Sequence, residues 1–297
     1  MVVMEDIKKS YGKISALKGV SFETGEGEIF GIIGPDGAGK TTIFRILTTL
    51  LLADSGRAVV DGLDVVRDYK KIREEVGYMP GRFSLYQDMT VEENLAFFAK
   101  VFNSSIEKNY YLIKDIYSQI EPFKTRRAGA LSGGMKQKLA LSCALIHKPR
   151  VLFLDEPTTG VDPVSRKELW GILKNLKHEG ITIIVSTPYM DEASMCDRIG
   201  LIREGNFLKI DTPENIIGDF GKSLWAVHSL SMSKLLKDLR CNKFVRTSFA
   251  FGDYHHVTVD MDNITLDGLK LYLQDKGHRD VEILPIMAGI EDCFMDL

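Results

Sequence analysis

The stretch Gly34–Thr42, GPDGAGKTT, carries residue types at a spacing that binds phosphate. It fits the pattern G-x-x-x-x-G-K-[ST], with the apolar run EIFGII before it and a helical pattern after it. Glycines let successive backbone N–H groups point inward at phosphate oxygens, and the following helix adds the positive end of its dipole. Lys40 is expected to reach the β- and γ-phosphates, and the Thr41 hydroxyl to ligate Mg²⁺. The predicted nucleotide-binding residues of this loop are Gly34, Pro35, Asp36, Gly37, Ala38, Gly39, Lys40, Thr41 and Thr42.

A second set of reactive groups is the acidic pair Asp155 and Glu156 at the end of the run RVLFLDEP. A short apolar run predicts a buried strand, which would deliver both carboxylates to the edge of the sheet where open α/β sheets bind ligands. Asp155 suits a direct or water-mediated contact with Mg²⁺, and Glu156 suits the activation of a water molecule. Such a pair alone is also typical of helix capping, but the upstream phosphate loop favours the catalytic interpretation.

A third candidate is LSGGMKQKLALSCALIHKP, which places Ser132, Gly133 and Gly134 at the start of a long amphipathic helix that Pro149 stops. A helix N-terminus with free N–H groups and a hydroxyl is a second phosphate receptor. Two receptors for one triphosphate favour a dimer with shared sites. Without the first loop, a simple serine N-cap would be the preferred interpretation.

The order and spacing of these motifs resemble the ATP-binding cassette (ABC) ATPase family, over about residues 1–220. Gly34–Thr42 resembles the Walker A loop, Val151–Glu156 the Walker B strand, Leu131–Gln137 the signature motif and Gly160–Pro163 the D-loop. The resemblance implies that the signature residues Leu131, Ser132, Gly133, Gly134 and Met135 face a partner's nucleotide, and it gives Gly160, Val161 and Asp162 as D-loop residues.

The same resemblance implies a stacking role on adenine for Tyr11, in KSYGK, and a requirement for ATP and Mg²⁺. In the family, two cassettes join head to tail, so each site takes Walker A and B from one chain and the signature from the other. Within the family, the chain looks most like ATPase subunits of multidrug-type exporters, notably the N-terminal cassette of YbhF-like proteins. The implied fold is an α/β P-loop cassette with a mixed sheet core and a helical subdomain at about residues 82–145.

Two positions depart from the family pattern. The strand ITIIVST is followed by Pro188 where the family has a histidine that donates to the γ-phosphate, and YMPG supplies Gly81 where the family has a glutamine. Loss of one preorganised donor costs about 10²–10³ in rate. We therefore expect good ATP binding and slow hydrolysis at this chain's own site, and a heterodimer with one working site rather than a homodimer. Rescue by Gln87 or Tyr189 is the alternative.

The helices and strands that must position these residues follow two different patterns along the chain. Up to residue 221, short apolar strands alternate with helical patterns, which predicts a largely parallel sheet; residues 1–221 form the expected ATP-binding domain. The box Thr90-x-x-Glu93 predicts a helix start. Residues 222–297 read β-α-β-β-α-β, a ferredoxin-like accessory domain with a short final helix.

Composition narrows the class of protein. The chain has 297 residues, 44% hydrophobic and 27% charged, which predicts a folded protein with a real core. A formal net charge of −3 gives no electrostatic case for nucleic acid as the main partner. The four scattered cysteines indicate reduced thiols, and the apolar runs fall short of the ~20 residues of a membrane span. His255–His256 are expected to point to opposite faces of a strand, in a surface role rather than as joint metal ligands.

The function predicted is the ATP-binding subunit of an exporter, held on the cytoplasmic face of the membrane by a separate membrane-spanning subunit and paired with a second cassette. A soluble ABC protein acting on DNA or ribosomes is an alternative. It is disfavoured by the single cassette and by the lack of a heptad run or basic patch. A nucleotide-gated regulator with little turnover is a further alternative, which Gly81 and Pro188 support. The transported substrate stays open.

Overall fold

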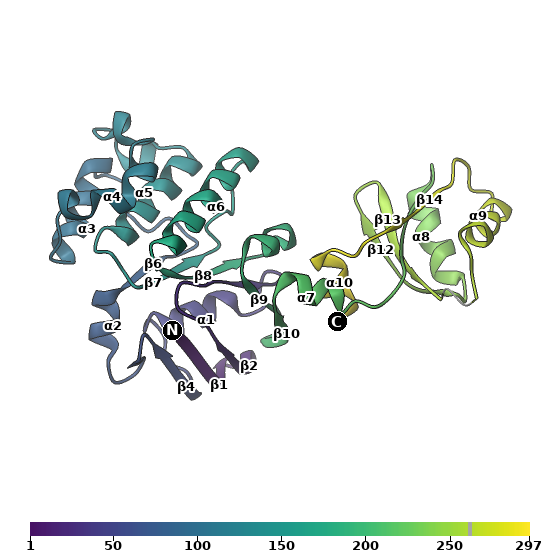
Figure 1. Ribbon diagram of the computed structural model, residues 1–297, viewed down its shortest axis with the longest axis horizontal. Coiled ribbons are helices and arrows are strands. Elements are labelled where there is room, and N and C mark those ends of the chain that lie inside the picture. Colours follow the sequence, from purple (N-terminus) through teal and green to yellow (C-terminus); the bar gives the residue numbers. More distant parts are fainter. Residues whose placement is uncertain (261–262) are drawn as a thin grey trace. The chain divides into compact units, whose positions relative to one another are not determined.

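The computed structural model describes residues 1–260 and 263–297, which divide into two compact units, Met1–Pro213 and Glu214–Leu297. The N-terminal unit is built on two sheets with helices around them, and the C-terminal unit has one sheet of its own (Figure 1). Each unit has a separate hydrophobic core. The sequence pattern places the domain boundary at residue 221, eight residues after the boundary between the two units.

The central sheet of the N-terminal unit is six-stranded, in the order β10-β9-β3-β8-β7-β6. Its members are β3 (Ile29–Ile33), β6 (Val76–Met79), β7 (Val151–Asp155), β8 (Thr182–Thr187), β9 (Arg198–Arg203) and β10 (Asn206–Asp211). All neighbours pair in parallel except the β9–β10 hairpin at the edge. Strands β3, β7 and β8 are buried along their whole length, which explains their unbroken apolar runs.

A second sheet is antiparallel and has the strand order β2-β1-β4-β5. The sequence pattern predicts a largely parallel sheet and does not distinguish this second one. Its strands are β1 (Val2–Tyr11), β2 (Ile14–Glu23), β4 (Ser55–Val60) and β5 (Leu63–Asp64). Helix α1 (Lys40–Leu47) contacts β2 and β4 of this sheet and β7 of the central one. The ring of Phe44 in α1 meets Phe153 in β7 edge to face, with centroids 6.1 Å apart. This packing fixes the helix that follows the phosphate loop.

A helical segment lies between β6 and β7 in the chain, as expected for about residues 82–145. Its helices are α3 (Val91–Val101), α4 (Ile106–Tyr117) and α5 (Gly133–Leu145); α2 (Tyr69–Glu75) precedes it and α6 (Pro163–His178) follows β7. The predicted capping box is present, because Thr90 Oγ1 accepts from Glu93 N and Glu93 Oε2 accepts from Thr90 N. The acidic segment Met190–Met195, expected to be helical, forms a 3₁₀ turn.

The C-terminal unit follows the element order β-α-β-β-α-β that the sequence predicts. Its elements are α7 (Pro213–Gly218, which begins at the unit boundary), β11 (Leu224–His228), α8 (Met232–Cys241), β12 (Val245–Phe251), β13 (Tyr254–Val259), α9 (Leu266–Asp275), β14 (Glu282–Ile286) and α10 (Ile290–Asp296). The sheet is antiparallel in the order β12-β13-β11-β14. The thiol of Cys293 in α10 donates to the carbonyl of Ile216 in α7 at 3.5 Å. This contact helps explain why α7 groups with the second unit.

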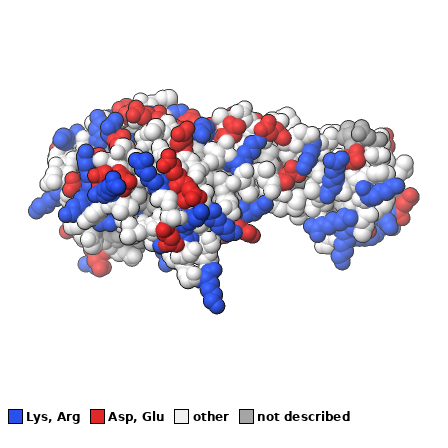
Figure 2. Space-filling model, turned by 90° about the horizontal axis from the view of Figure 1, so that it is seen from below, with Lys and Arg blue, Asp and Glu red and all other residues white. Residues whose placement is uncertain are grey.

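Surface charge is mixed. On the face in Figure 2, acidic and basic side chains are interspersed over the N-terminal unit, in keeping with the small formal net charge of −3. Among residues 1–260 and 263–297, the helices lack the combination of length and apolar character that crossing a membrane requires.

Candidate nucleotide-binding site

The phosphate loop runs from the end of β3 to the start of α1, as the sequence predicts. A Cβ at position 34 would lie 2.2 Å from the carbonyl oxygen of Ile202, and one at position 39 would lie 2.7 Å from that of Ala16. Neighbouring backbone therefore requires glycine at both positions, and Gly39 also has φ of +109°. The loop is fixed further by a hydrogen bond from Gly34 N to the carbonyl of Thr187 in β8, at 3.3 Å.

Lys40 folds back over this loop. Its Nζ donates to the carbonyl oxygens of Gly34 at 2.7 Å and Pro35 at 3.1 Å. The same nitrogen lies 3.2 Å from Glu156 Oε1 and 4.0 Å from Asp36 Oδ1. Its side chain is only 3% exposed. An ammonium group in this position can exchange its carbonyl and carboxylate partners for phosphate oxygens.

The acidic pair lies where the sequence predicts, at the end of β7. Asp155 is buried, and its Oδ1 accepts a hydrogen bond from Ser186 Oγ in β8 at 2.7 Å. Glu156 has φ of +52°, a left-handed conformation that is uncommon outside glycine. Its backbone N–H is held by the carbonyl and the hydroxyl of Ser186, at 3.1 and 3.0 Å. Strand β8 thus holds the carboxylate of Asp155 and the backbone of Glu156, whose own carboxylate reaches Lys40.

The two positions that depart from the family pattern both adjoin this pair or the loop. A Cβ at Gly81 would lie 3.0 Å from the carbonyl oxygen of Asp155 and 3.8 Å from Cβ of Glu156. Pro188 follows Thr187, whose carbonyl accepts from Gly34 N. Neither residue offers a side-chain donor to the site.

Gln87 and Tyr189, the two residues that could replace the missing donors, have other partners. Tyr189 lies under the guanidinium of Arg166, 4.1 Å from the ring centroid to Cζ, and its N–H donates to Thr187 Oγ1 at 3.1 Å. The carbonyl of Gln87 accepts from Gly129 N at 2.9 Å, and its side chain is on the surface. Arg166 also faces the buried Glu192, with Nε 3.6 Å from Oε1. The sequence pattern gives no signal for this Arg166–Glu192–Tyr189 cluster, because Arg166 comes from α6 and the other two residues from the 3₁₀ turn after β8.

The signature segment caps a helix and meets the D-loop. Ser132 Oγ accepts from Met135 N at 3.3 Å, so this serine is the N-cap of α5. A Cβ at Gly133 would lie 3.4 Å from the carbonyl oxygen of Gly160. Asp162 caps α6, and hydrogen bonds from the backbone N–H and the hydroxyl of Ser165 hold the pKa of Asp162 below its usual range.

The signature and the phosphate loop open different helices, α5 and α1. Figure 1 shows α5 beside α3 and α4, and α1 next to the sheets. Among the described residues, hydrogen bonds and ion pairs connect Lys40 with Glu156 but do not connect residues 131–135 with residues 34–42.

Tyr11 ends β1 and is 45% exposed, opposite Ile14 across the turn to β2. Because Ala16 of β2 lies against Gly39, this hairpin runs beside the phosphate loop. Thr41 and Thr42 lie in the first turn of α1 and are half-buried. An exposed aromatic ring next to the loop is suited to stacking on a flat base.

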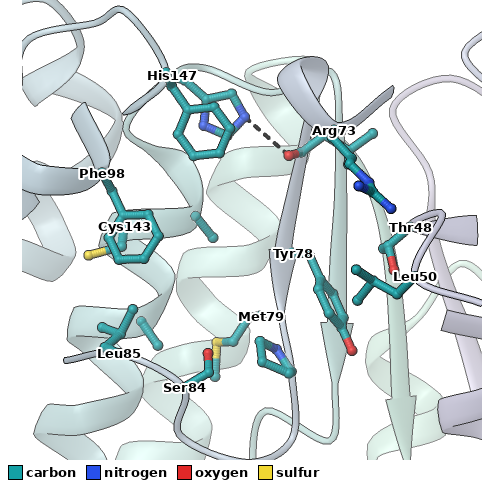
Figure 3. A pocket seen from close by; sticks show the side chains of 15 residues that line it. Thr48, Leu50, Arg73, Tyr78, Met79, Ser84, Leu85, Phe98, Cys143 and His147 are labelled. Carbon is teal, nitrogen blue, oxygen red and sulfur yellow. Dashed lines mark hydrogen bonds between the residues drawn. The ribbon is translucent and has the colours of Figure 1, made fainter. Parts of the chain in front are cut away.

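A groove lies beside this site, and the sequence pattern does not predict it. It has a volume of about 180 Å³ and lies between β6 and the helices α3 and α5 (Figure 3). Its lining includes Leu85, Phe98 and Phe102. Burial raises the pKa of Tyr78 to about 12, with the carboxylate of Asp155 adding to the effect. The groove therefore reaches from the helical segment to a neutral hydroxyl near the acidic pair.

His147 closes one end of the groove, two residues after the C-terminus of α5. Its ring stacks on Phe102 with centroids 3.9 Å apart, and its Nε2 lies 3.2 Å from the carbonyl of Val76. Burial lowers the pKa of His147 to about 4, against the opposing effect of that hydrogen bond.

The prediction of a surface role for the pair His255–His256 is wrong for His255, which is 4% exposed and bonds the carbonyl of Met232 at 2.9 Å through Nε2. Its strand position faces α8, because α8 covers that side of the sheet. His256, on the opposite face, contacts Asp292 Oδ1 at 2.7 Å. Among the described residues, histidine, cysteine and acidic side chains do not cluster as a metal site requires.

Comparisons with known proteins agree with this geometry. The family model described as "ABC transporter" matches residues 17–159. YbhF of Escherichia coli (strain K12), named a probable multidrug ABC transporter ATP-binding protein, is 39% identical over 218 residues, which are 73% of this chain. This chain spans only 38% of the length of YbhF.

Other relatives match over most of their length. Nod factor export ATP-binding protein I of Rhizobium sp. (strain N33) is 39% identical over 295 residues, 98% of this chain and 94% of that protein. Among solved structures, the dimeric post-hydrolysis state of the cassette MJ0796 bound to ADP and Pi has a TM-score of 0.66 at 26% identity, covering 71% of this chain and 98% of that one.

Proposed function

We propose a function from one premise: this chain belongs to the ABC transporter family of ATP-binding proteins. The proposed function is that of the ATP-binding subunit of an exporter, which couples ATP binding and hydrolysis to efflux through a separate membrane-spanning subunit. Relatives with names that state drug resistance or Nod factor export support the exporter role. The observation that carries the proposal is Lys40, buried in the phosphate loop and 3.2 Å from Glu156. The proposed location is the cytoplasmic face of the membrane.

The proposed ligand is ATP with Mg²⁺. Residues 34–42 would hold the phosphates and Tyr11 the adenine. The donor set fits Mg²⁺, because the Thr41 hydroxyl and the Asp155 carboxylate are hard oxygen ligands and Ser186 already orients Asp155. Mg²⁺ in such a site supplies positive charge to the phosphate oxygens. The proposed role of Glu156 is to orient and polarise an attacking water.

We propose that hydrolysis at this chain's own site is slow. Glycine at position 81 and proline at position 188 leave that site without two donors, at positions that adjoin Asp155 and the phosphate loop. Phosphate binding rests on Lys40 and backbone groups, so it should survive these changes. The effects of the two substitutions need not multiply, since residues acting as a unit are not additive.

The proposed second partner is another cassette. Ser132 and Gly133 open α5, away from α1, so this chain's signature would serve a partner's nucleotide. An intact signature beside a weakened hydrolytic site fits a heterodimer, in which this chain completes the working site of a different cassette, better than a homodimer.

We propose that the groove in Figure 3 receives the cytoplasmic helix of the membrane-spanning subunit. Part of its apolar lining, including Leu85, Phe98 and Phe102, comes from the helical segment, which the resemblance to the family implies as the contact with the membrane subunit. Tyr86 and Phe97, which pack edge to face at 5.0 Å, extend an exposed aromatic surface from its rim.

Within the C-terminal unit, residues 222–297 are proposed as a ferredoxin-like accessory domain, and residues 1–221 are proposed as the ATP-binding domain. The β-α-β-β-α-β order and antiparallel sheet of the C-terminal unit support the first assignment.

A nucleotide-gated regulator with little turnover is the second candidate, which the same two substitutions favour. Two measurements separate the candidates. The exporter proposal predicts co-purification with a multi-span membrane protein, together with ATP turnover that appears when the partner cassette is added. A chain with full activity as a partner-free monomer would refute it, and a complex that binds ATP without any turnover would favour the regulator.

A further inference from the structure

We infer that Asp36 makes nucleotide binding at this site selective for the magnesium complex over metal-free ATP. The inference rests on the proposed function and names the ionic form of the nucleotide that the loop accepts. Asp36 lies at the tip of the phosphate loop, and its side chain is 90% exposed. A carboxylate at this point repels the phosphates that the loop is shaped to bind.

The charge on Lys40 is already shared between two carboxylates. Its Nζ lies 3.2 Å from Glu156 Oε1 and 4.0 Å from Asp36 Oδ1. A third carboxylate, Asp155, is buried next to Glu156 in the chain. The attraction that Lys40 offers to phosphate is therefore reduced before the nucleotide arrives, and part of that attraction must come from a cation brought with it.

Metal-free ATP carries roughly two more negative charges than its magnesium complex, because the bound cation neutralises phosphate oxygens. Repulsion by a fixed carboxylate grows with the charge of the ligand. Asp36 therefore opposes the metal-free form more strongly than the magnesium complex. Glu156 acts in the same direction, but it is also the proposed catalytic residue, so Asp36 is the position that isolates the effect.

The position also allows a clean substitution. Asparagine has nearly the same shape as aspartate, and an ion pair this exposed contributes little to folding stability. Asp36→Asn should thus leave the loop intact and remove only the charge. An exposed charge is screened by salt over about 10 Å at 0.1 M ionic strength, so the effect must weaken in concentrated salt.

The test is equilibrium binding of the non-hydrolysable analogue AMP-PNP to the full chain, once with excess EDTA and once with excess Mg²⁺. For Asp36→Asn we expect affinity for the metal-free analogue to rise about 5-fold and affinity for the magnesium complex to rise no more than about 2-fold. The difference between these two affinity changes should be smaller at 1 M salt, where charges are screened over only about 3 Å.

Two variants serve as controls. Asp36→Glu keeps the charge and should retain the magnesium dependence of the parent. Asp253→Asn removes an exposed carboxylate from the turn between β12 and β13 in the C-terminal unit and should change neither affinity. Equal changes in both affinities for Asp36→Asn, or none, overturn the inference while leaving ATP binding in place. Failure of the parent to bind the analogue in either condition overturns the proposed function as well.

Discussion

The ammonium group of Lys40 lies 3.2 Å from a carboxylate oxygen of Glu156, although more than a hundred residues separate them in the sequence. The parallel strands β3, β8 and β7 are neighbours, and both residues follow the carboxyl end of such a strand. A triphosphate entering the loop must compete with Glu156 for Lys40. Binding would then release the carboxylate for its proposed contact with water.

Replacing Lys40 should remove most of the affinity for nucleotide. For Lys40→Ala we expect a loss of about 10–100-fold, the scale of a lost hydrogen bond to a charged group. Titration with Mg-AMP-PNP measures it. Lys174→Ala, on the exposed face of α6, is the matched control and should bind like the parent. Unchanged affinity in Lys40→Ala would place the phosphates elsewhere.

Restoring the missing donors should speed hydrolysis. We expect Pro188→His with Gly81→Gln to raise steady-state turnover of the isolated chain by about 10-fold or more, because one preorganised donor is worth about 10²–10³ and two need not multiply. Pro188→His should give the larger share, since a Cβ at position 81 lies 3.0 Å from the Asp155 carbonyl and needs a small shift.

Adding Glu156→Gln to that double variant checks the source of the gain. The acceleration should disappear, because the neutral amide cannot activate water. Acceleration that persists would come from a contaminating ATPase or from another base.

Ser132→Ala should separate the signature role from the role of a helix cap. Ser132 and Ser105 each accept a backbone N–H at 3.3 Å, from Met135 and Lys108. Both alanine variants should lose about 1 kcal/mol of unfolding free energy. Only Ser132→Ala should lower turnover in the complex with the partner cassette, while nucleotide affinity of the isolated chain stays unchanged. Equal turnover in both variants would mean that Ser132 acts only as the N-cap of α5.

His147 should make the N-terminal unit less stable in mild acid. Because burial lowers its pKa to about 4, the unfolded chain binds the proton more tightly, so the stabilising contribution is complete above about pH 6.5 and falls as the pH drops. Between pH 7 and pH 5, the parent should lose about 2 kcal/mol more unfolding free energy than His147→Gln. Urea titrations at both pH values measure this, with His178→Gln, an exposed histidine, as the control.

Much of the fold prediction rests on residues that lie close together in the chain. The glycines of the phosphate loop, the Thr90–Glu93 box and the alternation in the C-terminal unit each lie within a few residues, so the sequence displays them directly. The antiparallel sheet escaped prediction because its strands pair across long separations, as β1 does with β4. The same reason hides the groove and the cluster of Arg166 with Glu192, which tertiary packing assembles.

Tertiary contacts also explain where the local pattern misled, as in the surface role predicted for His255. His255 occupies a strand position that alternation alone cannot assign to core or surface, and α8 buries it. The segment after Pro188 has the composition of a helix, yet it forms a 3₁₀ turn in which Ala193 and Glu192 are buried.

The most direct measurement is equilibrium binding of Mg-ATP to the purified full chain, followed at low temperature by calorimetry. The account predicts saturation at one nucleotide per chain, with product formation at this site much slower than exchange of the bound nucleotide. A chain that retains no Mg-ATP at millimolar supply would contradict it, because every role proposed here begins with that loop holding a triphosphate.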